Sequence, residues 1–215
     1  MISVWMDGAE QHHDTRKPWS ITPMTRIDGV DAIHVVSLSE SANVAIGSRA
    51  LARTQVRLGS QVGQFLGDPV ALEFATARDL AAEPVEEAHC IRFFTPTTLK
   101  DGNRSSPLLE PIRLARSTVS RWNSLFADPA DHLDITDAQG VWVSDLDGRN
   151  EVVKLHSTTV SGFVGRMRFV CTTEESARLF SRLWAFAEHA GVGAYTAAGM
   201  GCVLREPTWQ PRRSR

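Results

Sequence analysis

The chain has 215 residues, of which 42% are apolar and 22% are charged, values typical of a folded soluble protein with one large domain or two small ones. Its net charge of -2 excludes a basic surface spread over the whole chain, so any nucleic-acid contact would depend on local patches. No apolar run is long enough to cross a membrane and no signal peptide is recognisable, so we expect a cytoplasmic protein. Cys90, Cys171 and Cys202 lack the spacing of a zinc site, and we expect buried thiols, no metal and no cofactor.

The first 84 residues predict a short set of elements. Residues 30–38 alternate between apolar and polar side chains as a strand does, and residues 41–52 are compatible with a helix. Residues 54–58 and 71–75 read as two further strands. The acidic, non-alternating run at residues 79–87 is the predicted domain boundary.

From residue 85 onward the elements predict a ferredoxin-like order of strands and helices. The predicted strands are 88–94, 141–143, 152–160, 162–171 and 202–204, with a turn at 145–148. The first predicted helix spans 110–126, and the second follows a capping box of Thr172 and Glu175 and ends at Gly191. We therefore expect an α+β protein whose C-terminal domain covers residues 85–210, followed by a basic tail at 211–215.

A glycine-rich segment, Gly191 to Gly201, lies between the last helix and the last strand. Dinucleotide and P-loop sites need the opposite order, in which the loop precedes a helix, so this segment does not predict a nucleotide cofactor. Its backbone N–H groups could approach a phosphate chain closely. The alternative is a turn whose small residues pack under the helix, and the residues alone favour that alternative.

The sequence resembles the CRISPR-associated repeat-RNA endoribonucleases, the sixth Cas family of the repeat-associated RNA-binding superfamily. The resemblance lies in five segments in order: Lys17-Pro-Trp-Ser-Ile-Thr-Pro-Met24, Ile91-Arg-Phe-Phe-Thr-Pro-Thr97, the helix of residues 107–126, Val160-Ser-Gly-Phe-Val-Gly165 and Gly191 to Gly201. It implies two tandem ferredoxin-like domains. The N-terminal domain, residues 1–84, would be abbreviated, because the family has a strand and a helix before the Lys-Pro-Trp segment.

The resemblance also implies where the chemistry lies. In the family a histidine shortly before the Lys-Pro segment is the general base, which points to His12 or His13 here. Gapless alignment favours His12, whereas the acidic residue that follows His13 favours His13. Lys17 or Arg16 would hold the scissile phosphate. Histidine suits proton transfer near neutral pH and a cation suits the charge that develops on phosphate. The alternative is a solvated polar stretch without a catalytic role.

The candidate RNA-binding residues fall into three groups. The glycine-rich segment contributes Gly191, Gly193, Tyr195, Thr196, Gly199 and Gly201; the cationic residues of the last strand–helix pair are Arg166, Arg168, Arg178 and Arg182; and Thr97 and Lys100 end the strand that begins the domain. The four arginines, together with Lys154, could line a phosphate track, and Thr97 and Lys100 could touch phosphate. Tyr195 is expected to stack on a base or to pack on the sheet. Arg178 could instead form a surface ion pair with Glu174.

The expected function is therefore metal-independent cleavage of CRISPR repeat RNA, in which the 2′-hydroxyl attacks the adjacent phosphate and leaves a 2′,3′-cyclic phosphate. The partners would be the repeat RNA, its guide-RNA product and other subunits of an interference complex. One alternative is a guide-RNA-binding subunit without catalytic activity. A second is a ferredoxin-like domain that binds small molecules or proteins.

Overall fold

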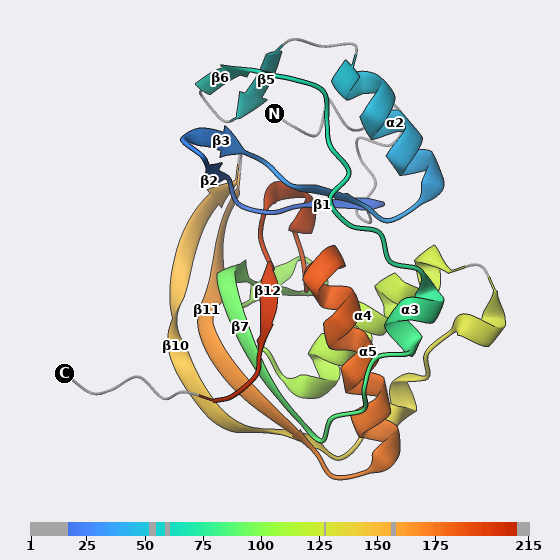
Figure 1. Cartoon of the computed structure of the whole chain (residues 1–215). Helices are drawn as coiled ribbons and strands as arrows, with labels where there is room; N and C mark the ends of the chain where they lie inside the picture. The colour runs from blue at the N-terminus through green and yellow to red at the C-terminus, as the bar shows by residue number, and fades with distance from the viewer. Residues whose placement is uncertain (1–16, 52–54, 59–60, 127, 156–157, 210–215) are drawn as a thin grey trace.

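The computed structural model describes residues 17–51, 55–58, 61–126, 128–155 and 158–209 (Figure 1). Its C-terminal half has the elements β7 (Ala88–Thr97), α4 (Pro111–Leu125), β10 (Val141–Leu155), β11 (Thr158–Cys171), α5 (Glu174–Ala190) and β12 (Val203–Glu206). The four strands form one antiparallel sheet in the order β10-β11-β7-β12. Helices α4 and α5 cover one face of this sheet (Figure 1). This is the ferredoxin-like arrangement that the sequence predicts.

The N-terminal part is built from smaller pairings. Strand β1 (Trp19–Ile21) pairs with β4 (Val35–Ser37), β2 (Thr25–Ile27) with β3 (Val30–Ala32), and β5 (Gln55–Leu58) with β6 (Gln61–Gln64). Helix α2 (Glu40–Leu51) follows β4, and the short helix α3 (Ala77–Ala81) precedes β7. The predicted helix is therefore confirmed. The prediction of a single strand at 30–38 is wrong, because this range forms two short strands. Val30–Ala32 pairs with β2 across the Asp28–Gly29 turn, and Val35–Ser37 pairs with β1.

Residues 71–75 do not form the predicted strand. Their alternation is present, but the segment has no regular secondary structure, and Leu72 and Phe74 are 72% and 86% exposed. Alternation produces a strand only where a neighbouring strand can pair with it.

The turn predicted at 145–148 is also wrong, because β10 runs through it. Asp145 and Asp147 lie opposite Arg168 and Arg166 on β11, so these acids serve as cross-strand partners of arginines. Gly148 is needed for packing, since a Cβ there would lie 2.5 Å from the ring of Phe163.

The capping box of α5 is shifted by one residue from its predicted position. Thr173 is the N-cap and Ser176 completes the box, whereas Thr172 donates its hydroxyl hydrogen to Gly140 O at 2.9 Å. The predicted helical stripe is confirmed, and the helix ends before Gly191, which has φ +72°.

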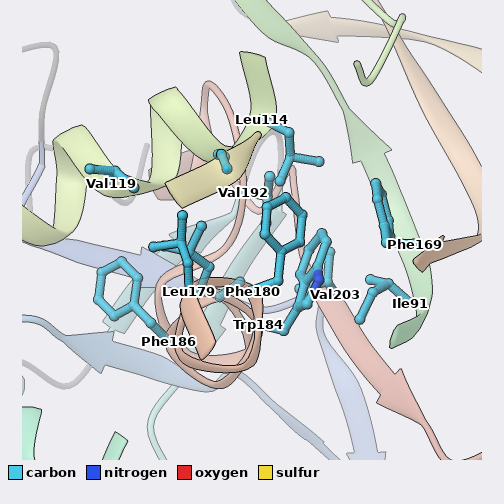
Figure 2. Close-up of a cluster of buried hydrophobic side chains, with 14 of the residues drawn as sticks. Ile91, Leu114, Val119, Phe169, Leu179, Phe180, Trp184, Phe186, Val192 and Val203 are labelled. Carbon is cyan, nitrogen blue, oxygen red and sulfur yellow. The ribbon is translucent and has the colours of Figure 1, made fainter. Parts of the chain in front are cut away.

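The core lies between the sheet and the two helices. Trp184 of α5 is fully buried, with ring centroids 5.0 Å from Phe169 and 6.2 Å from Phe93 (Figure 2). Val192, the second residue of the glycine-rich segment, is 1% exposed and belongs to the same cluster. The start of the segment is therefore anchored in the core. Of the helices in the described part of the chain, none has the length and apolar character that a bilayer crossing needs.

His89 on β7 faces this core and is 3% exposed. Burial, with a smaller contribution from the charge of Arg205, lowers its pKa to about 4. Its Nε2 has no hydrogen-bond partner among the described residues. The ring is therefore a neutral core group near pH 7.

We expect this histidine to make the fold acid-sensitive. The unfolded chain, in which the pKa is about 6.5, binds the proton before the folded chain does. Stability is therefore complete above pH 6.5 and falls as the pH drops towards 4, by about 3 kcal/mol. Urea unfolding of the wild type and His89→Phe at several pH values measures this: the difference between them should change over that range. Parallel curves would contradict it.

Candidate nucleic-acid interface

The glycine-rich segment has a backbone that only glycine accommodates at several positions. Gly193 and Gly201 have φ values of +75° and +71°. A Cβ on Gly193 would lie 2.3 Å from Thr98 O, and one on Gly201 would lie 2.0 Å from Val192 O. These two glycines therefore allow the segment to pack against the end of β7 and against itself.

Most amides of the segment are used in that packing. Val192 N donates to Gly201 O at 2.8 Å, Ala194 N to Thr98 O at 2.9 Å, and Gly201 N to Pro96 O at 3.1 Å. In the glycine-rich segment, the amides without an acceptor among the described residues are those of residues 193 and 195–197. Those of residues 195–197 lie at the left-handed Tyr195 and in the 3-10 turn η3 (Thr196–Ala198) that follows it. The prediction that the small residues pack under the helix thus holds for Gly191 and Gly201, which are both buried. The Tyr195–Ala197 turn retains amides that no acceptor among the described residues uses.

A hairpin of β8 (Leu99–Asp101) and β9 (Arg104–Ser106) adds a positive charge beside this turn. Lys100 Nζ lies 5.1 Å from the centre of the Tyr195 ring, within cation–π range. Thr97, by contrast, is fully buried, and its hydroxyl donates to Thr95 O at 3.1 Å. The structure therefore brings Lys100 and Tyr195 together and places Thr97 in the interior.

The four predicted arginines do not share one surface. Arg166 and Arg168 alternate with the core residues Met167 and Phe169, so they lie on the sheet face opposite the helices. Arg178 and Arg182 are on α5, which covers the other face. The expectation of one track through all four is wrong for this reason.

Carboxylates partner most of these arginines. Arg166 makes a bidentate contact with Glu206, at 2.6 and 3.1 Å. Arg168 lies 3.6 Å from Asp145. Arg178 forms an ion pair with Glu174 on the same helix, as the alternative prediction for Arg178 expected. Arg182 Nε is buried and has no hydrogen-bond partner within the described residues.

The segment that begins at Lys17 packs onto the glycine-rich segment. Ser20 Oγ donates to His189 O at 2.7 Å, and Cys202 Sγ lies 3.4 Å from Ile21 O. Figure 1 shows β1 lying across the end of α5, and β1 also contacts η3. Lys17 is thereby placed near the turn at Tyr195. His12, His13 and Arg16 fall outside the described residues.

Sequence analysis missed Arg121 of α4, which connects these parts. Its guanidinium donates through one nitrogen to Ala190 O and Thr196 Oγ1, both at 2.7 Å, and through the other to Lys17 O and Trp19 O, both at 3.4 Å. Burial lowers the pKa of Arg121 to about 10, so it stays charged at neutral pH. The signals in the sequence were the resemblance of the helix that contains Arg121-Trp122 to the family and a cation next to the apolar stripe of α4.

Comparison with solved structures supports the same fold. A Cas6 product complex is 26% identical, with a TM-score of 0.75 over 92% of this chain and 85% of that one. Thermus thermophilus Cas6 is 20% identical, with a TM-score of 0.67 over 92% and 82% of the two chains. The product of a Cas6-related gene from Pyrococcus furiosus is 14% identical, with a TM-score of 0.57 over 92% and 82%. The last two show the fold alone, which is the tandem ferredoxin-like fold predicted from the sequence.

No curated protein sequence is significantly similar to the chain. The model of the family described as CRISPR-associated endoribonuclease Cas6 matches residues 91–203, which is more than half of the chain. That region contains β7 from residue 91 onward, both core helices and the whole glycine-rich segment. The chain belongs to the Cas6 family of CRISPR-associated endoribonucleases.

Proposed function

We propose that this protein binds CRISPR repeat RNA and cuts it at one phosphodiester without a metal ion, by attack of a 2′-hydroxyl that leaves a 2′,3′-cyclic phosphate and a 5′-hydroxyl. Family membership supports an RNA-cleaving activity. The similar Cas6 chains include one solved as a product complex and one as a substrate mimic complex, and repeat RNA is the substrate we infer from them.

The contact between the Lys17 segment and the glycine-rich segment carries the proposal. It joins the part of the chain that follows the two histidines to the Tyr195–Ala197 turn, whose amides lack an acceptor among the described residues. A phosphate bound at that turn would lie near the backbone of Lys17, because the Arg121 guanidinium contacts both Lys17 O and Thr196 Oγ1. Residues far apart in the sequence are thus available to one phosphodiester.

The roles follow from the chemistry of the reaction. His12 or His13 would remove the proton of the 2′-hydroxyl, since an imidazole titrates close to neutral pH. Lys17 would stabilise the negative charge that develops on the phosphorane. A water or the second histidine would protonate the leaving 5′-oxygen.

The RNA would bind first at the turn and the neighbouring hairpin. The free amides of residues 195–197 and the charge of Lys100 suit a phosphate, and the Tyr195 ring offers a face for a base. Arg166 and Arg168 would contact RNA only where it extends over the open sheet face, and Arg178 and Arg182 only along α5. The acidic partners of Arg166 and Arg168 make their contribution smaller than that of Lys100.

We further propose that the protein stays on the guide RNA after cleavage and joins other subunits. A partial Cas6-RT-Cas1–Cas2 complex contains a chain that is 14% identical, with a TM-score of 0.54, of which the match covers 40%. The likeness to that chain supports a fold able to join such an assembly.

A cleavage and binding assay of the wild type with repeat RNA tests the function. Cleavage in excess EDTA, with affinity that falls steeply as salt rises, is the expected result. Tight binding without cleavage would identify a guide-RNA-binding subunit instead. Absence of binding even at low salt would rule out the RNA function and favour a ferredoxin-like domain that binds small molecules or proteins.

A further inference from the structure

The guanidinium of Arg121 lies at a junction of three separate parts of the chain. It starts from α4 and reaches the end of α5, the turn η3 and the backbone of residues 17–19. These parts are 69 to 104 residues away from it in sequence. No other described side chain hydrogen-bonds to both the Lys17 segment and η3.

The partners of this charge are all neutral oxygens. Three are backbone carbonyls and one is the hydroxyl of Thr196. Among the described residues no carboxylate lies within salt-bridge distance of Arg121. A partly buried charge that has no counter-ion among the described residues is costly unless its hydrogen bonds are well made, and an apolar side chain would pack there at lower cost. What offsets the cost of burying this charge is a fixed geometry. The planar guanidinium of arginine provides such a geometry, whereas the ammonium of lysine does not.

We propose that Arg121 is a positioning residue for RNA cleavage: it holds the Lys17 backbone at a fixed distance from the Tyr195–Ala197 turn, so that a phosphate bound at the turn is aligned with Lys17. This inference rests on the proposed function. It also gives Thr196 a different role from the one its sequence suggests. Thr196 is 6% exposed and its hydroxyl accepts from Arg121, so the side chain of Thr196 acts through Arg121 and leaves contact with phosphate to the backbone of the turn.

The first test separates chemistry from binding. We compare Arg121→Met and Arg121→Lys with Arg116→Met and Arg116→Lys, because Arg116 is on the same helix but exposed. Single-turnover cleavage at saturating RNA should fall 20- to 100-fold in Arg121→Met and less in Arg121→Lys. The Kd for RNA with a 2′-deoxy group at the scissile nucleotide should stay within threefold. Both Arg116 variants should stay within twofold of wild type.

Thr196 provides a second, milder variant pair. Thr196→Ser keeps the acceptor for Arg121 and should slow cleavage less than Thr196→Val, which removes the acceptor and should slow cleavage about fivefold to tenfold without raising Kd. The Arg121→Met/Thr196→Val double variant should be no slower than Arg121→Met alone, because both changes break one interaction. Effects that multiply, or a raised Kd in Thr196→Val, would overturn the assignment.

A readout independent of activity distinguishes failure of this inference from failure of the proposed function. Hydrogen exchange should speed up at residues 17–22 in Arg121→Met, Arg121→Lys and Thr196→Val, while Tm changes by no more than a few degrees. Unchanged exchange in all three variants would overturn the inference, and so would an equal loss of affinity and rate. If the wild type binds RNA but does not cleave it, the proposed chemistry fails, and faster exchange would still support the positioning role. If Arg121→Met fails to fold, the hydrogen exchange and cleavage rates of Arg121→Lys and Thr196→Val decide whether the inference holds.

Discussion

Replacement of both His12 and His13 by alanine is expected to slow cleavage of repeat RNA by about 10²–10⁴-fold, the usual contribution of a positioned acid or base. The loss should be confined to the chemical step, because neither residue belongs to the proposed RNA-binding turn. Affinity for uncleavable RNA should remain within a few-fold of wild type. Single-turnover rates at saturating protein, with Kd from filter binding, measure both quantities.

The single variants decide which histidine is the base. One of His12→Ala and His13→Ala should reproduce the loss seen in the double variant, and the other should cleave within about tenfold of wild type. The rate of the wild type should rise with pH to about 7 and that of the inactive single variant should not. His132→Ala is the control, since His132 is an exposed residue that contacts Phe126 O at 2.9 Å. Full activity in the double variant would contradict a histidine mechanism.

Replacement of Gly201 by alanine is expected to have the largest effect on stability among the glycines of the loop. The residue has φ +71°, and a Cβ would lie 2.0 Å from Val192 O, which is backbone and cannot move without shifting the core residue Val192. We expect a cost of about 1–2 kcal/mol for the left-handed conformation and about 1–3 kcal/mol more for the clash. Urea unfolding of the wild type and of Gly201→Ala measures the loss in the free energy of unfolding.

Gly199 provides the matched control for this prediction. Its φ of +84° carries the same conformational cost, but the nearest atom to an added Cβ is 3.9 Å away. Gly199→Ala should therefore lose only about 1–2 kcal/mol. If the free energy of unfolding falls equally in the two variants, the contact of the added Cβ with Val192 O adds no cost at position 201, which would contradict the prediction. Where Gly201→Ala is still folded, weaker RNA binding is expected because the turn at Tyr195 depends on the same backbone.

The sequence predicted the C-terminal domain well because its elements bury one face each. The alternation around Met167 and Phe169 and the helical stripe around Trp184 both reflect burial in a single core. Errors arose where a local pattern had a long-range cause. The acids at 145 and 147 resemble a turn but face arginines across the strand, and Leu72 and Phe74 alternate without a neighbouring strand.

The site was predictable only in part, for a related reason. The glycine-rich segment could be recognised by its residues, but which of its amides are free depends on Thr98 and Pro96, about 100 residues earlier. Arg121 belongs to a helix that resembles the family, but the resemblance gave it no role, and its role follows from the folding of residues 17–19 and 190–196 around it. Thr97 and the four arginines were selected by type, and type does not reveal which side of a sheet a residue faces.

The chemistry of cleavage is tested most directly by the ends of the products. Repeat RNA should be cut in excess EDTA, and mass spectrometry should find a 2′,3′-cyclic phosphate on the upstream fragment and a 5′-hydroxyl on the downstream one. A 2′-deoxy substitution at the scissile nucleotide should abolish cleavage and leave binding intact. Cleavage of the deoxy substrate, or a 3′-hydroxyl with a 5′-phosphate, would contradict attack by the 2′-hydroxyl.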